Sequence, residues 1–298
     1  MKDPFKEIIK MNDYIIYADS ACDIKPEILK EWGVEFLPLT FRFSDSEKEY
    51  VDGEIDPRDF YARMREGAVA KTAAVNAERF AEEFEKILSA GKDLLYIGFS
   101  SGLSTTYNSG RLAAEQLREK YPDRKIITVD SLSASAGFGL LLYLTVGMKD
   151  EGATIEEAAA FAEETRFHLC HWFTVDDLVY LKRGGRISPT LAFVGNALGI
   201  KPVLHMDDEG HLINMSKVRG RRSSVLALAD KYGELALDRK GGTVFICHGD
   251  CDEDVETLKR VLADKYGAQV KLVTYTGTVI GAHSGPGTLA LFFVGEHR

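Results

Sequence analysis

Cysteine is scarce in this sequence, and the four cysteines, at positions 22, 170, 247 and 251, are scattered along the chain. A disulfide framework or a zinc site normally shows cysteines paired at short spacing, and no C-x₂-C pair occurs here. Cys247, His248 and Cys251 supply only three ligand-type residues, which an ordinary loop after a strand explains more simply. We therefore expect free thiols, no metal and no other cofactor.

Long apolar stretches are missing as well. The first residues, MKDPFKEIIKMND, carry charges throughout and do not have the pattern of a secretory signal. The longest uncharged run covers residues 131–148, but its apolar part begins only near Ala136 and is short for a bilayer. We expect a buried helix at 136–148, no integral membrane segment and a cytoplasmic protein.

Basic residues are outnumbered, with 37 Lys and Arg against 46 Asp and Glu and a net charge of −9. Such a surface repels phosphates, so a nucleic-acid partner is not expected. The sequence also has no P-loop and no glycine-rich ATP-binding motif, so ATP binding by this chain is not indicated.

Short apolar runs alternate with helical segments along the whole chain. The expected strands are 14–18, 34–43, 94–99, 125–129, 169–174, 243–247 and 270–275, and the expected helices include one from Pro57, 77–90 and 104–120. This alternation predicts an α/β fold, and 298 residues predict two domains. We expect an N-terminal domain, 1–165, with a Rossmann-like parallel sheet and flanking helices. Residues 202–217 have the pattern of a hairpin, so the C-terminal domain, 166–298, is expected to be α/β with a mixed sheet.

Ser- and Asp-rich loops follow three of the expected strands: DSACD after Ala18, SSGLST after Phe99 and DSLSAS after Val129. The carboxyl ends of parallel strands meet at one edge of a sheet, where ligands bind. In the second loop, the hydroxyls of Ser100, Ser101 and Ser104 stand beside free N–H groups at a helix start, an arrangement suited to a carboxylate or a phosphate.

The same loop also matches the G-x-S-x-G pattern of serine hydrolases, with Ser100 as nucleophile and His283 as base. Against an esterase or thioesterase, the helix is expected to begin only near Ser104, and no HGGG-type oxyanion segment precedes the loop. A serine-rich turn without a ligand is a third interpretation.

Two basic segments stand out in the second half: Arg183-Gly184-Gly185-Arg186, and KVRGRR at 217–222. Solvated loops are the simplest explanation of both. In an acidic protein they can also form a docking patch for a phosphate or an acidic partner.

Taken in order, several short segments resemble the DegV family, which includes the fatty-acid-binding subunits of bacterial fatty-acid kinase. The matching segments run over about residues 14–295: Asp19-Ser20 with Asp23, Lys71-Thr72, SSGLS at 100–104 with Thr106-Tyr107, Asp130-Ser131 with Gly137 and Gly139, LKRGGRIS at 181–188, Ile200-Lys201-Pro202, Lys217 with Arg219, and His283 with Gly285-Pro286-Gly287. No single segment is specific, but the ordered set is.

The resemblance implies two domains enclosing one long-chain fatty acid. It implies that Thr72 and Ser101 or Ser104 hold the carboxylate, and that His283 lies near the same head group. By the same resemblance, the basic side chains at 183, 186 and 219 lie near the head group or contact a separate ATP-dependent kinase subunit. The sequence departs from the family pattern after Thr72, where AAVN replaces Ser, Pro and Ser, and at Thr105, where glycine is usual.

We therefore interpret the chain as a carrier without catalytic residues. It would bind one long-chain fatty acid in a buried apolar tunnel, with the helix at 136–148 as a wall, and present the carboxylate to a fatty-acid kinase subunit. Each buried CH₂ contributes about 0.8 kcal/mol, so a long chain supplies on the order of 10 kcal/mol before entropic costs. A serine esterase using Ser100, and a phosphometabolite-binding protein, are the alternatives.

Overall fold

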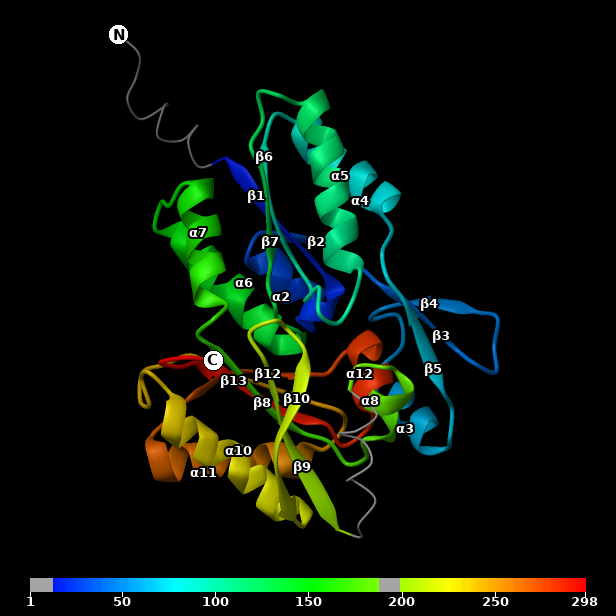
Figure 1. The fold of residues 1–298 in the computed structure, drawn as a ribbon, viewed down its shortest axis with the longest axis vertical. Coiled ribbons are helices and arrows are strands. Elements are labelled where there is room, and N and C mark those ends of the chain that lie inside the picture. Colours follow the sequence, from blue (N-terminus) through cyan, green and yellow to red (C-terminus); the bar gives the residue numbers. More distant parts are fainter. Residues whose placement is uncertain (1–12, 188–198) are drawn as a thin grey trace.

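The computed structural model describes residues 13–187 and 199–298, which form an α/β structure with three sheets (Figure 1). Sheet A is parallel, with strand order β2-β1-β6-β7. Its strands are β1 (Tyr14–Asp19), β2 (Val34–Leu37), β6 (Asp93–Gly98) and β7 (Ile126–Asp130). The expected Rossmann-like parallel sheet of the N-terminal half is confirmed.

Helices cover both faces of sheet A. Helices α4 (Ala77–Ser89) and α5 (Thr106–Lys120) cover one face, and α6 (Ser135–Asp150) and α7 (Ile155–Thr165) cover the other. Helix α2 (Pro26–Glu31) connects β1 to β2 along the chain. Both faces are apolar because consecutive side chains of a strand point to opposite faces of the sheet. In β6, Tyr96 packs against α4 and α5, whereas the next residue, Ile97, belongs to the cluster with α6. The helix at 104–120 begins two residues later than expected, at Thr106.

Sheet C is mixed, with order β10-β9-β8-β13-β11-β12. Its strands are β8 (Leu169–Thr174), β9 (Ile200–Met206), β10 (Leu212–Arg219), β11 (Val244–His248), β12 (Val270–Tyr275) and β13 (Leu289–Val294). Helices α10 (Arg221–Leu235) and α11 (Asp252–Tyr266) cover one face. The expected hairpin is the antiparallel β9–β10 pair, and only β11 and β12 are parallel among its pairs.

Helix α6 lies between sheets A and C (Figure 1). Its buried Phe138 and Leu142 share one apolar cluster with Ile97 of sheet A and with Phe245 and Phe292 of sheet C. The expectation of a buried helix is therefore confirmed. The expectation that residues 136–148 wall a tunnel is not supported, because two packed sheets cover them and none of them lines the cavity described below, to which α6 contributes Ser135.

Residues 34–43, expected as one strand, are two strands in different sheets. Strand β2 ends at Leu37, and Pro38 follows, which has no N–H to continue a ladder. The chain then turns into sheet B, with order β4-β3-β5. Its antiparallel strands are β3 (Thr40–Phe43), β4 (Glu49–Val51) and β5 (Ala70–Ala73), and α3 (Pro57–Arg65) packs beside them.

The remaining helices of the described residues are short: α8 (Val179–Arg183), α12 (Thr278–Ser284) and the 3-10 helix η1 (Ser20–Cys22). We expect the boundary between the two domains at residue 165, where the chain passes from α7 to sheet C. The position of this boundary stays a prediction. Ser188 of the LKRGGRIS segment and residues 1–12 lie outside the described residues. No helix within the described parts of the chain is long and apolar enough to cross a membrane.

Candidate functional site

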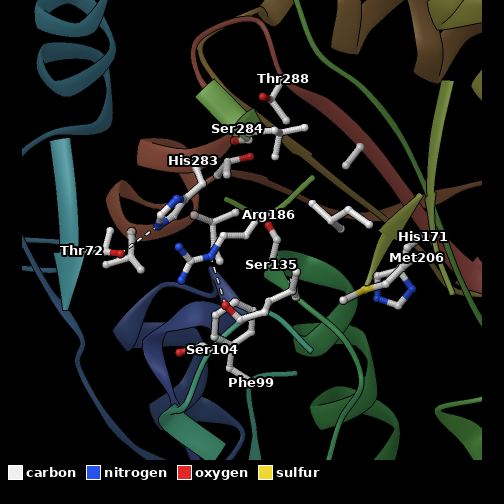
Figure 2. A pocket seen from close by; sticks show the side chains of 18 of the residues that line it. Thr72, Phe99, Ser104, Ser135, His171, Arg186, Met206, His283, Ser284 and Thr288 are labelled. Carbon is white, nitrogen blue, oxygen red and sulfur yellow. Dashed lines mark hydrogen bonds between the residues drawn. The ribbon is translucent and has the colours of Figure 1, made fainter. Parts of the chain in front are cut away.

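A cavity of about 400 Å³ lies where the carboxyl ends of sheet A meet sheet B, α12 and one face of sheet C (Figure 2). Small-molecule sites commonly have volumes of roughly 300–1,000 Å³. Most of the wall is apolar and comes from all of these elements, for example Leu39, Phe99, Phe173, Leu212, Ile280 and Phe292.

The loops after β6 and β7 form one side of this cavity. These strands are parallel neighbours, so both loops leave the same edge of sheet A. Ser101 and Ser104 line the cavity from the first loop, and Ala134 from the second, as the strand order predicts. The third Ser- and Asp-rich loop, after β1, contributes no lining residue.

One part of the cavity reaches the surface, and the opposite part is deeply buried. The mouth is formed by exposed lining residues, Ala73, Ala74, Ser101 and Thr105. The deep end includes His171 and Met206, which are 3% and 1% exposed. Two of the mouth residues, Ala73 and Thr105, are positions at which the sequence departs from the family pattern, so these departures lie at the mouth.

The polar end of the cavity joins sheet B to α12. The Thr72 Oγ1 and His283 Nε2 atoms are 2.8 Å apart and share a hydrogen bond (Figure 2). Burial, and then the guanidinium of Arg186, lower the pKa of His283 to about 4, so the ring is neutral. Its Nδ1 atom is buried, has no hydrogen-bond partner in the described parts of the chain, and packs against Gly184, where a Cβ would lie only 2.2 Å from it. The glycine turn therefore makes room for the histidine ring.

Arg186 extends into the same end of the cavity (Figure 2). It donates hydrogen bonds only to backbone carbonyls, from Nε to Leu103 O at 3.1 Å and from a terminal nitrogen to Gly184 O. Burial lowers its pKa from the ordinary value. Within residues 13–187 and 199–298 no carboxylate pairs with it, so an uncompensated cation faces the cavity.

Ser101 and Ser104 differ in what their hydroxyls do. The Ser104 hydroxyl shares a 2.9 Å hydrogen bond with that of Thr106 and accepts one from the Thr106 N–H at 3.2 Å. Ser101 is exposed, and its backbone N–H donates to the Asp130 carboxylate at 3.2 Å. Its hydroxyl has no hydrogen-bond partner among the described residues.

Ser100 does not line the cavity, contrary to the expectation that it binds the ligand. It is fully buried, and its hydroxyl donates to the Gly210 carbonyl at 2.9 Å and accepts from the Gly102 N–H at 3.2 Å. The turn after β6 directs this side chain toward the β9–β10 connection. The hydrogen bonds of this hydroxyl join the two halves of the fold. The hydroxyl is therefore not available to a substrate as a nucleophile.

The other two basic residues lie outside the cavity lining. Arg183 is exposed at the end of α8, with its guanidinium 5.7 Å from the Tyr180 ring centroid, and Arg219 is exposed on the edge strand β10. Nearby, Lys201 and Arg221 both pair with Asp176, at 2.9 and 3.6 Å. The basic segments thus separate into one cavity residue and a solvent-exposed set.

Asp52, which fixes the start of α12, is a residue that sequence reasoning missed. Its carboxylate accepts hydrogen bonds from the Thr278 N–H at 3.1 Å and the Thr278 hydroxyl at 2.7 Å, which caps α12, and from Ser20 at 2.7 Å. Helix α12 carries His283 and Ile280 into the cavity. The partners lie 226 residues apart, and only an Asp-Gly turn marks position 52 in the sequence.

The comparisons with known proteins agree with this geometry. The family model described as "Uncharacterised protein, DegV family" matches residues 14–296. A DegV domain-containing protein of Clostridium perfringens is 43% identical over 97% of this chain and 99% of its own. The similar solved structures include a DegV lipid-binding protein of Thermotoga maritima (31% identity, TM-score 0.83, 96% of this chain and 99% of that one) and a stearic-acid-binding protein of Eubacterium ventriosum (27%, 0.85, 95% and 98%). On the match of the family model over nearly all of its length, the chain belongs to the DegV family.

Proposed function

We propose that this protein binds one long-chain fatty acid, with the acyl chain in the apolar cavity and the carboxylate at its polar end. Arg186 is the observation that carries the proposal. A half-buried guanidinium that no carboxylate of residues 13–187 and 199–298 pairs with, at one end of an apolar cavity, is the counter-charge that a buried carboxylate needs. The similar structure from Thermotoga maritima is that of a lipid-binding protein, and the one from Eubacterium ventriosum is that of a stearic-acid-binding protein.

Thr72 and His283 complete the proposed head-group site. If His283 Nε2 carries the proton, it donates to Thr72 Oγ1, and the Thr72 hydroxyl is then free to donate to the carboxylate. In this arrangement His283 positions Thr72 and stays neutral. Ser101 and Ser104 stand at the same end and offer hydroxyls to the second oxygen.

Mass spectrometry under native and denaturing conditions, with delipidated protein and added octadecanoic acid, tests the proposal. We expect one bound fatty acid per chain. The Thr72→Val variant should bind it about tenfold more weakly, because a hydrogen bond to a charged acceptor contributes about 1.5–3 kcal/mol. The matched Ser100→Ala variant should keep its affinity. No lipid after extraction and no binding of added acid would end the proposal.

We further propose that the carboxylate is presented to a separate ATP-dependent fatty-acid kinase subunit and that this chain does not itself catalyse the reaction. Ser101 and Thr105 open the head-group end to solvent, and Arg183 and Arg219 supply exposed positive charge for an acidic partner surface. The Arg219→Ala variant should retain fatty acid but lose acyl-phosphate formation with the kinase subunit and ATP. Full turnover by this variant at physiological salt would refute the docking role.

The alternatives find less support. An esterase using Ser100 needs an accessible hydroxyl, and this one is buried and hydrogen-bonded to Gly210. A small phosphometabolite does not need the aromatic wall formed by Phe99, Phe173 and Phe292. Labelling of Ser100 by a fluorophosphonate probe, or competition of inorganic phosphate with octadecanoic acid, would reverse this ranking.

A further inference from the structure

The deep end of the cavity contains a polar atom that a plain hydrocarbon chain would leave without a partner. His171, on β8, lines the cavity and is 3% exposed, and its Nε2 atom is buried with no hydrogen-bond partner among the described residues. Figure 2 shows His171 and Met206 together, on the side away from Thr72 and His283. A buried polar atom without a partner costs about 1–3 kcal/mol, so this atom requires an explanation.

The protonation state of the His171 ring follows from its other nitrogen. Nδ1 lies 2.9 Å from the carbonyl oxygen of Leu169, and a carbonyl can only accept, so Nδ1 carries the proton. Burial, and then the nearby guanidinium of Arg298, hold the pKa of His171 well below its ordinary value, so the ring is neutral. Nε2 therefore presents a lone pair and can only accept a hydrogen bond.

We propose that the fatty acid for which this cavity is built carries a hydroxyl group on the distal part of its chain, and that this hydroxyl donates to His171 Nε2. The inference rests on the proposed fatty-acid function and names the class of acid, a hydroxy fatty acid. A keto or ester oxygen in the same position has no proton to donate and does not match this nitrogen.

The surroundings of His171 leave the ligand as the source of the donor. The ring edge meets Phe292, with centroids 5.4 Å apart, and the backbone of Gly137 approaches so closely that a Cβ there would lie 2.3 Å from Nε2. The nearby Ser135 hydroxyl already donates to Asp23. No protein hydroxyl of the described residues is therefore available to this nitrogen.

Met206 supplies the adaptability that the approach of a hydroxyl requires. Nε2 has almost no exposed surface, so a neighbouring side chain must shift for a ligand hydroxyl to reach it. Strands β8 and β9 are antiparallel with Phe173 opposite Leu204, a register that puts His171 opposite Met206 on the cavity face. An unbranched thioether changes rotamer more easily than a branched or aromatic side chain.

The test compares octadecanoic acid with a positional series of monohydroxyoctadecanoic acids and the corresponding keto acids, using delipidated full-length protein. The wild type should bind the best-placed hydroxy isomer at least as tightly as octadecanoic acid. His171→Phe should bind that isomer at least about tenfold more weakly than octadecanoic acid, because the hydroxyl is then buried without a partner. The control, His297→Phe, replaces an exposed histidine outside the cavity lining and should keep the order of the wild type.

The keto acids and a spectroscopic measurement make the result independent of the variants. In the wild type, every keto isomer should bind more weakly than octadecanoic acid, and nitrogen NMR should show the unprotonated imidazole nitrogen of His171 shifting only with the hydroxy isomer. If octadecanoic acid binds and the wild type rejects every hydroxy isomer as strongly as His171→Phe does, the inference is wrong and the proposed function stands. If no acid of either kind binds, both are wrong.

Discussion

The guanidinium of Arg186 is half-buried and forms no ion pair with a carboxylate of the described residues. Arg183, three residues earlier, is exposed. Two arginines of one glycine turn therefore have opposite surroundings. From the sequence, both were equally suited to a partner or a head group, since Gly184 and Gly185 allow either direction. The structure separates them through the Leu103 carbonyl, to which only Arg186 donates.

Replacing Arg186 by Met should weaken fatty-acid binding roughly ten- to hundredfold, because the carboxylate loses its counter-charge while the apolar stem is kept. The Arg183→Met control should bind as the wild type does. Isothermal titration of delipidated protein measures both. Equal affinities in the two variants would place the carboxylate away from Arg186.

His283 gives the protein a defined response to acid. Its pKa in the folded protein is about 4, below the ordinary 6.5, so the unfolded chain binds more protons between these values. The stability that the neutral ring contributes is complete above about pH 6.5 and is lost as the pH falls toward 4. The loss follows because burial, and then the charge of Arg186, oppose protonation of this ring in the folded protein.

The His283→Gln variant, which cannot titrate, should therefore lose less stability than the wild type when the pH falls from about 7 to about 5. Urea unfolding at the two pH values measures the difference between the free energies of unfolding. The exposed His297→Gln variant is the control and should follow the wild type. A His283→Gln protein as acid-sensitive as the wild type would mean that other groups determine the response.

At the scale of elements, the start of α12 is held by a carboxylate from the residue that follows β4 of sheet B. Asp52 accepts two hydrogen bonds from Thr278 at the helix start, and burial raises the pKa of Asp52. Replacing Asp52 by Ala should lower the free energy of unfolding by about 1–3 kcal/mol and also weaken fatty-acid binding, because α12 carries His283.

The control for this prediction is Thr154→Ala, which removes the capping box of α7. It should lower stability by about 1 kcal/mol without changing affinity, since no residue of α7 lines the cavity. Urea unfolding and fatty-acid titration of both variants separate the effects. An Asp52→Ala protein that is destabilised but binds normally would show that α12 keeps its position without the cap.

The elements themselves were largely predictable, and their mutual contacts were not. Strands β8 and β12 have the predicted bounds because uninterrupted apolar or alternating runs mark them. The division of 34–43 into two sheets depends on Pro38 and on pairing with β5, thirty residues away, which no local pattern contains. The same is true of the site: serine loops marked the correct edge of sheet A, but only the fold distinguishes the buried Ser100 from Ser101.

At the scale of the whole molecule, the two predicted domains share a core. The cluster around α6 contains side chains from sheets A and C, and the cavity is lined from both. Separating the halves would expose Phe138 together with Phe245 and Phe292, and burial of such aromatic side chains contributes about 1.5–3 kcal/mol each. The halves should therefore unfold together, even though each has a complete sheet.

The chain's two tryptophans allow this to be measured, since Trp32 lies in the N-terminal half and Trp172 on β8. Fluorescence of Trp32→Phe and Trp172→Phe should give a single, coincident unfolding midpoint in each protein when compared with circular dichroism. Octadecanoic acid at a free concentration about a hundredfold above its Kd should stabilise both signals by about 2.7 kcal/mol. Ligand stabilisation of one signal alone would show that the acid belongs to one domain and that the shared core around α6 does not couple the two. A common shift instead requires that the ligand and α6 hold sheets A and C as one cooperative unit.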